Sequence, residues 1–561
     1  MTGPDDSRSL ISRRSRTIGW VTPIRRWLPE YRWKTGFASD AIAGVAVAAL
    51  LIPESMGYAG VAGVPAEVGL YAALAAVVAY AVTGGVSILV VGPASAVAAL
   101  SASIVAEFGG DADPVAVTVA LAISSGVLLM VAGWLRLGWV VNFISKPVLE
   151  AFVAGLSISI IIGQLDGLLG VEADADSAIG SLLDVLGRID QWHIATAVIG
   201  ATAIAALLAL ERAVDRIPGA VIVVILGVAG AVVFDLAASG VAVVGDIPQG
   251  LPTPGIPDLS GTRWLELLGA ATALLLVGFS EGYAAASAVA DHTGEDIDAD
   301  QELFSSGAAN LASGLMGGLA VGGSLSKSAA AQDAGARTQM ANLVAGVIVL
   351  ATLLFLAPLF EDLPEPVLAA VVIIAVLGSA DPRRVWRLWS VNRLDFAAAV
   401  LTFVLVLVWE TLPAMIVGVV LSLAFVVRRS SFPDVLELRQ DRDGRFTVAG
   451  SLAPETVGAM ALRFEGPLIY ANSERLRKAA TLLADRHPDV RRLILDCEML
   501  SDLDSSGAEA LVRLDEDLAA RNIVLHLGRV HVRAREQMQR SSLSERFAGR
   551  IHSSVSGALE V

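Results

Sequence analysis

Long apolar runs separated by short polar turns dominate most of this sequence. Residues 38–52, 116–134 and 343–359 are examples, and each run is too long for a buried β-strand. Because hydrophobic residues make up 55% of the 561 residues, most of the chain cannot form a water-soluble globule. The pattern predicts a polytopic α-helical membrane protein whose outer surface contacts membrane lipid.

Hydropathy and helix-breaking residues divide the apolar part into about fourteen spans. The expected ranges are 39–62, 69–84, 93–108, 114–135, 146–166, 193–211, 218–236, 265–290, 299–318, 325–335, 340–360, 366–380, 394–411 and 413–428. The third and tenth ranges are too short to cross a bilayer, so we expect half-helices there. An even number of spans places both termini on one side of the membrane.

Positively charged residues are concentrated in alternate loops, which indicates the orientation. They are Arg136, Lys146, Arg212, Arg216, Arg337, Arg383, Arg384, Arg387, Arg393, Arg428 and Arg429. Since Lys- and Arg-rich loops stay in the cytoplasm, we expect a multi-pass protein of the cell membrane with both termini cytoplasmic. The Arg-rich segment 1–37 precedes a full-length span, so we expect no cleavable signal peptide.

The composition changes after residue 429. Residues 430–436 are expected to be a linker between the transport domain, 38–429, and a cytoplasmic domain, 437–561. The predicted strands of this domain are 447–448, 462–464, 468–470, 493–495 and 524–527, and the predicted helices are 473–486, 506–521 and 532–541. Strands that alternate with helices predict a small α/β domain.

Charge and cysteine content exclude several classes of function. From residue 432 onward the chain has 18 Lys and Arg against 20 Asp and Glu, so this part contributes −2 to the net charge of −16 and the rest −14. A nucleic-acid partner is therefore not expected. Cys497 is the one cysteine, which leaves no internal disulfide. We expect no enzyme activity, cofactor or metal, and the acidic run 291–300 is expected to be a solvated loop because its spacing is not that of a calcium loop.

Two interrupted apolar segments, 88–96 and 319–329, correspond to one another. Each has a short extended stretch, a Gly break and a helix start with small and hydroxyl residues. A half-helix that begins within the bilayer directs its N–H groups and positive dipole end at a bound anion. The expected anion-binding residues are Ala94, Ser95, Ala96, Ser324, Leu325, Ser326 and Lys327. Lys327 would pair with the anion; an internal salt bridge from Lys327 to Glu54 or Glu281 is a compatible alternative.

Glu54 and Glu281 lie in the middle of the first and eighth spans. An ionisable residue at this depth is costly and indicates a functional site, here one that binds and releases a proton. Glu54 precedes Pro93 by 39 residues and Glu281 precedes Ser324 by 43. The same order of acid-bearing span and broken helix thus occurs twice. With seven spans in each half, we expect a 7+7 inverted repeat.

Several motifs resemble the sulfate permease (SulP) family of anion transporters. They are IPESMGYA at 52–59, GVPAEVGLY at 63–71, VGPAS at 91–95, QEL at 301–303 with GAAN at 307–310, and GSLSKSA at 323–329. The resemblance implies two intertwined seven-helix repeats that form a core and a gate domain. It also implies elevator-like movement of the core, and a homodimer.

The C-terminal part resembles the STAS domain that follows these transporters. The motifs are GPLIYAN at 466–472, VRRLILD at 490–496 and LDSSG at 503–507. In soluble relatives the residue before the last Gly is phosphorylated, which implies a regulatory role for Ser506 and a cytoplasmic protein partner. The alternative is that Asp504 and its neighbouring serines only cap a helix.

Two departures from the family pattern affect the predicted coupling. Many members have Gln at the position of Glu54 and Arg at that of Lys327, and a carboxyl group favours proton coupling. Sodium-coupled bicarbonate members have Thr where this chain has Ala285 and Leu325, so a sodium site would lose hydroxyl ligands. We therefore predict proton-coupled sulfate uptake. The alternatives are sodium-coupled bicarbonate or C4-dicarboxylate transport, anion exchange, and a membrane-tethered STAS scaffold without transport.

Overall fold

The computed structural model describes residues 23–108, 113–139, 145–171, 177–213, 219–378, 381–409, 411–440, 446–448 and 458–559. By its packing the chain divides into two units, Met1–Ser422 and Leu423–Val561. Most of the predicted N-terminal segment 1–37 lies outside the described residues. The predicted domain boundaries stay predictions; α18 ends at Ser431 and the next strand begins at Val435.

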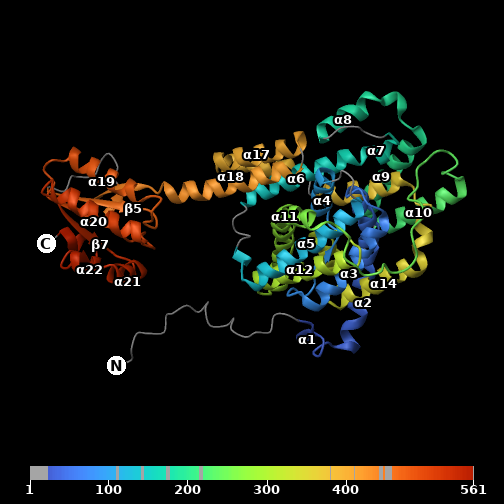
Figure 1. The fold of residues 1–561 in the computed structure, drawn as a ribbon, viewed down its shortest axis with the longest axis horizontal. Helices are drawn as coiled ribbons and strands as arrows, with labels where there is room; N and C mark the ends of the chain where they lie inside the picture. Colours follow the sequence, from blue (N-terminus) through green and yellow to red (C-terminus); the bar gives the residue numbers. More distant parts are fainter. Residues whose placement is uncertain are drawn as a thin grey trace. The chain divides into compact units, whose positions relative to one another are not determined.

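The first unit is almost wholly helical (Figure 1). Its α-helices are α1 (Ile24–Trp27), α2 (Trp33–Val61), α3 (Ala66–Thr83), α4 (Ser95–Phe108), α5 (Pro114–Trp134), α6 (Lys146–Gly163), α7 (Leu165–Leu169), α8 (Ala178–Gly187), α9 (Ile194–Ala213), α10 (Gly219–Phe234), α11 (Gly261–Thr293), α12 (Ala299–Leu315), α13 (Leu325–Asp333), α14 (Met340–Ala351), α15 (Glu365–Leu377), α16 (Pro382–Arg387), α17 (Arg393–Val408) and α18 (Thr411–Ser431). A π-helical turn, η3 (Thr352–Leu356), and a 3-10 turn, η4 (Ala357–Phe360), extend α14.

Each of the fourteen expected ranges overlaps at least one of these helices. Within the described residues, seven are long and apolar enough to cross a membrane: Gly36–Val61, Ala66–Thr83, Pro114–Trp134, Lys146–Leu169, Arg263–Thr293, Met340–Phe360 and Pro413–Ser431. The ranges predicted as half-helices hold α4 and α13, which are shorter. The total of fourteen spans stays a prediction. Helix α8 was not among the expected ranges.

The helices pack in two groups. Helices α2–α5 pack mainly with α11–α14, and α6–α10 mainly with α15–α17. Small residues permit the closest approach in the first group: a Cβ atom on Gly126 of α5 would lie 2.4 Å from the Leu311 nitrogen of α12, and one on Gly307 would lie 2.5 Å from the Met130 nitrogen. Such contacts are typical of helices that associate without a hydrophobic driving force.

A two-stranded ladder lies in the middle of the first group. Strands β1 (Val90–Gly92) and β2 (Gly322–Ser324) pair antiparallel, with Val90 opposite Ser324 and Gly92 opposite Gly322. Each strand leads directly into a half-helix, α4 or α13. Asn310 fixes the approach to β2, because its amide both donates to the Val321 carbonyl and accepts from the Val321 nitrogen, at 2.8 and 2.9 Å. The ladder therefore holds the starts of the two half-helices beside one another.

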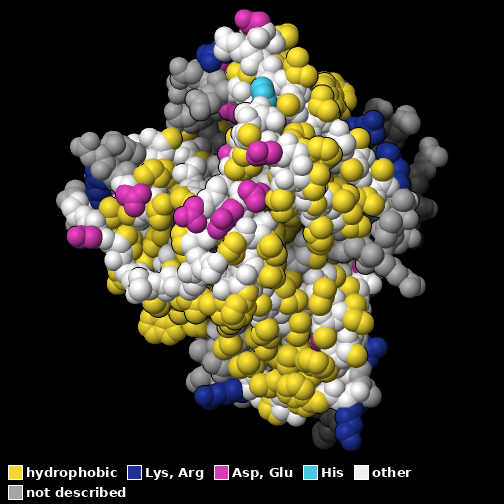
Figure 2. All heavy atoms as spheres, turned by 90° about the vertical axis from the view of Figure 1, so that its right-hand side faces the viewer, with side chains coloured by type: hydrophobic (Ala, Val, Ile, Leu, Met, Phe, Trp, Pro, Cys, Tyr) yellow, Lys and Arg dark blue, Asp and Glu magenta, His cyan; other side chains and the backbone are white. Residues whose placement is uncertain are grey.

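Apolar side chains cover much of the face of the molecule drawn in Figure 2. Among the described residues of the first unit, Val233 and Phe234 of α10 are 74% and 73% exposed, and Phe355 is 73% exposed. Large apolar side chains on the outside are unfavourable in water and favourable in lipid. The surface thus agrees with the apolar runs of the sequence.

The second unit contains a six-stranded sheet in the order β4-β3-β5-β6-β7-β8. Its elements are β3 (Val435–Gln440), β4 (Phe446–Val448), β5 (Ala459–Phe464), α19 (Ser473–Arg486), β6 (Arg492–Asp496), α20 (Ser505–Ala519), β7 (Val524–Gly528), α21 (Val532–Arg540), α22 (Leu543–Arg546), β8 (Ile551–His552) and α23 (Val555–Leu559). Strands β5 to β8 are parallel, and β3 pairs antiparallel with both neighbours. The predicted α/β alternation is confirmed.

The strand predicted at 468–470 is wrong. Leu468 forms an isolated bridge with Leu503, and the chain then turns into α19. The Asn472 side chain fixes this turn: it accepts from the Ile469 nitrogen at 3.0 Å and donates to the Pro467 carbonyl at 2.9 Å. Local side-chain bonds thus override the apolar pattern of this segment.

Candidate functional site

Glu54 and Lys327 form an ion pair inside the first group of helices. Glu54 follows Pro53 within α2 and is 4% exposed, and Lys327, in the first turn of α13, is 1% exposed. Lys327 Nζ lies 2.5 Å from Glu54 Oε2. The contact is ionic rather than a well-aligned hydrogen bond, because within the described residues this oxygen has no hydrogen-bond partner. One of the two salt bridges predicted for Lys327 is therefore present.

Two further groups hold the Lys327 ammonium. Its Nζ donates to the Pro93 carbonyl at 3.2 Å, which connects the second half-helix to the entry of the first. It also lies 5.3 Å from the centre of the Tyr58 ring, a cation–π contact. Tyr58 was not among the predicted site residues. Its spacing of four residues from Glu54 on α2 places both side chains on one helix face and could have indicated it.

Glu281 of α11 lies in the same neighbourhood, since α11 packs directly on β2. A Cβ atom on Gly323 would lie 2.9 Å from Gly282 Cα, so the two backbones touch. Glu281 is partly buried, its Oε2 is enclosed, and within the described residues that atom has no hydrogen-bond partner. The charge of Lys327 acts on Glu281, and the charges of both glutamates act on Tyr58. The structure thus places a second carboxyl group near the Glu54–Lys327 pair.

The first turn of α13 is open on one side. Ser324 caps the helix, and its Oγ accepts from the Lys327 nitrogen at 3.4 Å. Leu325 is 56% exposed and Ser326 is also exposed, whereas Lys327 and Ser328 are buried. The first N–H groups of a helix have no partner within the helix, so this exposed turn is the part of α13 that suits a small anion.

The first half-helix contributes smaller groups. Ala94 and Ala96 are buried, and their methyl side chains have no polar atom to offer. Ser95 is partly exposed and its hydroxyl interacts with the Tyr58 side chain. The structure therefore brings together the residues predicted at both half-helices with both predicted acids. Within the described residues, no three His, Cys, Asp or Glu side chains are grouped to hold a metal ion.

Ser506 lies in the second unit, in the first turn of α20, and is partly buried. Asp504 is the N-cap of this helix and accepts from the Gly507 nitrogen at 2.7 Å. A Cβ atom on Gly507 would lie 2.2 Å from the Leu468 carbonyl oxygen, so glycine is needed there. The capping role of Asp504 is present, and a regulatory role of Ser506 stays a prediction. Cys497 directly follows β6 and is buried, and burial, with the adjacent Asp496, raises the pKa of its thiol well above the usual range.

The fold and this buried charged centre define the chain as a multi-pass membrane transporter with a C-terminal α/β domain. It belongs to the sulfate permease family: the profile of that family matches residues 37–402, and that of the STAS domain matches residues 452–558. The predicted family is confirmed.

The relatives and similar structures cover almost the whole chain. "Probable sulfate transporter MT1781" of Mycobacterium tuberculosis is 32% identical, over 95% of this chain and 96% of its own length. "Sulfate transporter 4.1, chloroplastic" of Arabidopsis thaliana is 31% identical, over 98% and 84%. These relatives are named as transporters rather than enzymes. A structure of the murine Slc26a9 anion transporter, in the inward-facing state, superposes with a TM-score of 0.89 at 22% identity, covering 98% of this chain and 96% of that one.

Proposed function

We propose that this protein takes up sulfate together with protons. The names of the relatives support sulfate as the substrate. The observation that supports the coupling is the Glu54–Lys327 ion pair. In this pair, a carboxyl group that can bind a proton neutralises the ammonium group with which an anion would otherwise pair. The exposed first turn of α13 offers the unpaired N–H groups beside it.

Protonation of Glu54 and binding of the anion favour one another in this arrangement. While Glu54 is ionised, it neutralises Lys327 and repels an incoming anion. A protonated Glu54 has no charge, so Lys327 becomes available to pair with the anion. By linkage, the bound anion in turn favours the protonated form of Glu54. Proton and anion therefore cross together, with Glu281 as a second coupling or structural acid.

The proposed transport motion is an elevator. The packing of the helices in two groups supports it, because both half-helices, Glu54 and Glu281 all belong to the group α2–α5 with α11–α14. This group would move as a core past a gate formed by the other group. The 7+7 inverted repeat, fourteen spans, cytoplasmic termini and a homodimer are part of the same proposal. A protein partner of the STAS domain and regulation through Ser506 complete it.

The substitution Glu54→Gln tests the coupling, because Gln keeps the size of the side chain and cannot bind a proton. We expect wild-type protein in liposomes to accumulate radiolabelled sulfate when the outside is acidic. The variant should still exchange sulfate but neither accumulate it nor respond to pH. Glu266→Gln is the matched control, since Glu266 lies exposed on α11, and it should keep the pH response. An unchanged pH profile in Glu54→Gln would contradict the proposal.

The same liposomes distinguish the substrates and driving ions. Sulfate, bicarbonate and fumarate are supplied in turn under an imposed proton or sodium gradient. We expect sulfate to accumulate with the proton gradient alone. Ala285 is buried and Leu325 carries no hydroxyl, so the two positions offer no side-chain oxygen to a sodium ion. Sodium-driven bicarbonate uptake would establish the alternative substrate, and failure of all three anions to move would favour a STAS scaffold.

A further inference from the structure

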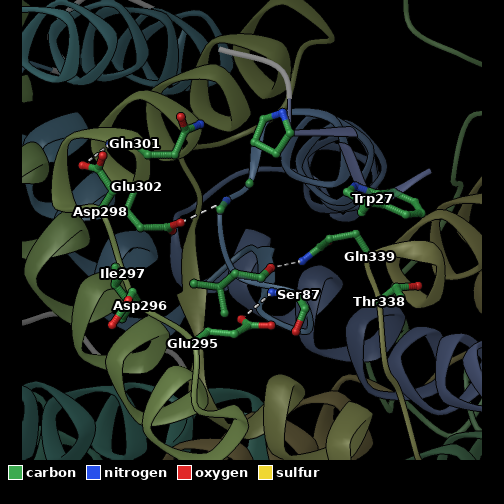
Figure 3. A pocket seen from close by; sticks show the side chains of 14 residues that line it. Trp27, Ser87, Glu295, Asp296, Ile297, Asp298, Gln301, Glu302, Thr338 and Gln339 are labelled. Atoms are coloured by element: carbon green, nitrogen blue, oxygen red, sulfur yellow. Dashed lines mark hydrogen bonds between the residues drawn. The ribbon is translucent and has the colours of Figure 1, made fainter. Parts of the chain in front are cut away.

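A cavity of about 370 Å³ lies away from the ion pair, where the loop between α11 and α12 meets the segment before β1 (Figure 3). Pro23 and Trp27 from the start of the described chain form part of its wall. In Figure 3, Trp27, Thr338 and Gln339 lie on one side and the residues of the α11–α12 loop on the other. The proposed transport mechanism makes no use of this cavity.

Acidic side chains gather on one wall of the cavity. They are Glu295, Asp296, Asp298 and Glu302. Within the described residues none of the four forms an ion pair, and the charges of Glu295 and Asp298 act on Glu302. Four carboxyl groups on one wall of a cavity without a paired cation repel one another, so the site favours a positively charged occupant.

A buried, unpaired acceptor also lines the cavity. Gln301 is 5% exposed, and its Nε2 donates to the Thr83 carbonyl at 2.6 Å, which fixes the orientation of the amide. Its Oε1 is enclosed and has no hydrogen-bond partner within the described residues. Leaving a buried acceptor unpaired is costly, typically about 1–3 kcal/mol. The occupant should therefore be a hydrogen-bond donor as well as a cation.

We propose that the Arg-rich segment 1–22 of this chain binds in the cavity through its arginine side chains. The segment contains Arg8, Arg13, Arg14 and Arg16 and no Lys. A guanidinium group has five N–H donors, which suits two carboxylates and an amide oxygen at once. The chain leaves the wall of the cavity at Pro23, and the seven residues back to Arg16 can extend roughly 25 Å, so the arginines reach it.

When bound, segment 1–22 stabilises residues 85–87, which lead into β1. Two of the acids already hold this segment: Glu302 accepts from the Gly85 nitrogen and Glu295 accepts from the Ser87 nitrogen, each at 3.1 Å. From the other wall, Gln339 donates to the Val86 carbonyl at 2.7 Å. An arginine that pairs with Glu295 and Glu302 keeps both carboxylates ionised and in place. Segment 1–22 thus acts on β1, the strand that precedes the first half-helix, α4.

Cysteine crosslinking in the full-length protein tests the docking. Cys497 is the one native cysteine and is buried, so introduced thiols react without interference. We expect Arg14→Cys with Asp296→Cys to form an intramolecular disulfide about tenfold faster than Arg14→Cys with Asp291→Cys. Asp291 is exposed on α11 close to the cavity but does not line it. The joined peptides are identified by mass spectrometry, at low and at high salt.

A cavity with two fewer acidic charges is the control. Glu295→Gln and Asp298→Asn keep the acceptor atoms for the Ser87 nitrogen and for the cap of α12, so the fold is preserved while two charges are lost. In this background, and at high salt, the faster crosslink should fall to the rate of the Asp291 pair. Equal rates for both pairs in the unmodified background would overturn the proposal, as would a preference for Asp296 that survives the loss of the two charges. If a free cation or a basic partner occupied the cavity in place of segment 1–22, the two pairs would crosslink at equal rates.

Discussion

The two broken segments share one architecture and differ in what they contribute. Each has a three-residue strand followed by a half-helix, β1 with α4 and β2 with α13. Within the described residues, the side chains that bond across the two segments belong to the second segment: Lys327 donates to the Pro93 carbonyl at 3.2 Å, and Ser328 Oγ accepts from the Val90 nitrogen at 2.9 Å. In these two bonds the first segment takes part through backbone atoms, the Pro93 carbonyl and the Val90 nitrogen.

The two segments therefore differ in what they supply to the site: its charge, and the side chain that holds the two segments together. The second segment supplies the cation, and Ser328 Oγ, which also donates to the Ser324 carbonyl at 2.6 Å, joins the two segments. The first segment supplies N–H groups and a partly exposed hydroxyl at Ser95. Changes in the second segment should therefore disturb both halves of the site, and changes in the first should remain local.

Replacement of Lys327 should give the largest effect. Lys327→Met keeps the length of the side chain but leaves Glu54 buried without its cation, a change that typically costs about 3–5 kcal/mol. We expect sulfate uptake to be lost and the thermal unfolding temperature to fall. Ser95→Ala in the first segment is the comparison, and it should retain most of the uptake and the stability.

A double variant separates the loss of sulfate uptake from the loss of stability. Lys327→Met with Glu54→Gln removes both charges, so the stability should largely return while uptake stays absent. Wild-type uptake by Lys327→Met would show that the ammonium does not serve the anion and would remove the asymmetry between the segments.

Matched glycine substitutions should give a smaller effect of the same sign. A Cβ atom on Gly323 would meet the Gly282 backbone, with its Cα at 2.9 Å, whereas one on Gly92 would meet the flexible end of Leu51, with Cδ1 at 2.8 Å. A side chain can move aside and a packed backbone cannot. We expect Gly323→Ala to lose stability at the upper end of the roughly 1–3 kcal/mol typical of overpacking. Gly92→Ala should lose clearly less, as measured by thermal unfolding. Equal losses would contradict the predicted difference.

The sequence was sufficient to locate the elements of the site but not their partners. The Gly breaks at both segments, the two acids at mid-span and the lone cation each carry a local signal, and the structure brings them together. The sequence left open whether Lys327 pairs with Glu54 or Glu281, because both spacings allow it. The Glu54 pair depends on how α2 packs against α13, which no local pattern encodes.

Other features depend on tertiary contacts in the same way. Strands of three residues are too short to show an alternating pattern, so the β1–β2 pairing could not be predicted. The Pro93 carbonyl carries no side-chain signal for its bond to Lys327. In the STAS domain, the apolar run 468–470 suggests a strand, but Asn472 holds it as a turn. The range predicted at 340–360 contains α14 and the π-helical turn that extends it. The turn could not be predicted, because its residues are as apolar as those of the helix before it.

Removal of the hydroxyl that joins the two segments should give the smallest effect. Ser328→Ala leaves the buried Val90 nitrogen without its acceptor and removes the donor to the Ser324 carbonyl, which together should cost about 1–2 kcal/mol. Ser326→Ala is the control on the same helix, because Ser326 is exposed and contacts Ser324 Oγ at 3.2 Å. We expect Ser328→Ala to lower the unfolding temperature with little change in the affinity for sulfate. Ser326→Ala should weaken sulfate binding with little change in the unfolding temperature, since Ser326 lies at the exposed turn through which we propose that the anion reaches α13. If Ser328→Ala weakened sulfate binding without a change in stability, Ser328 would belong to the anion site rather than to its frame.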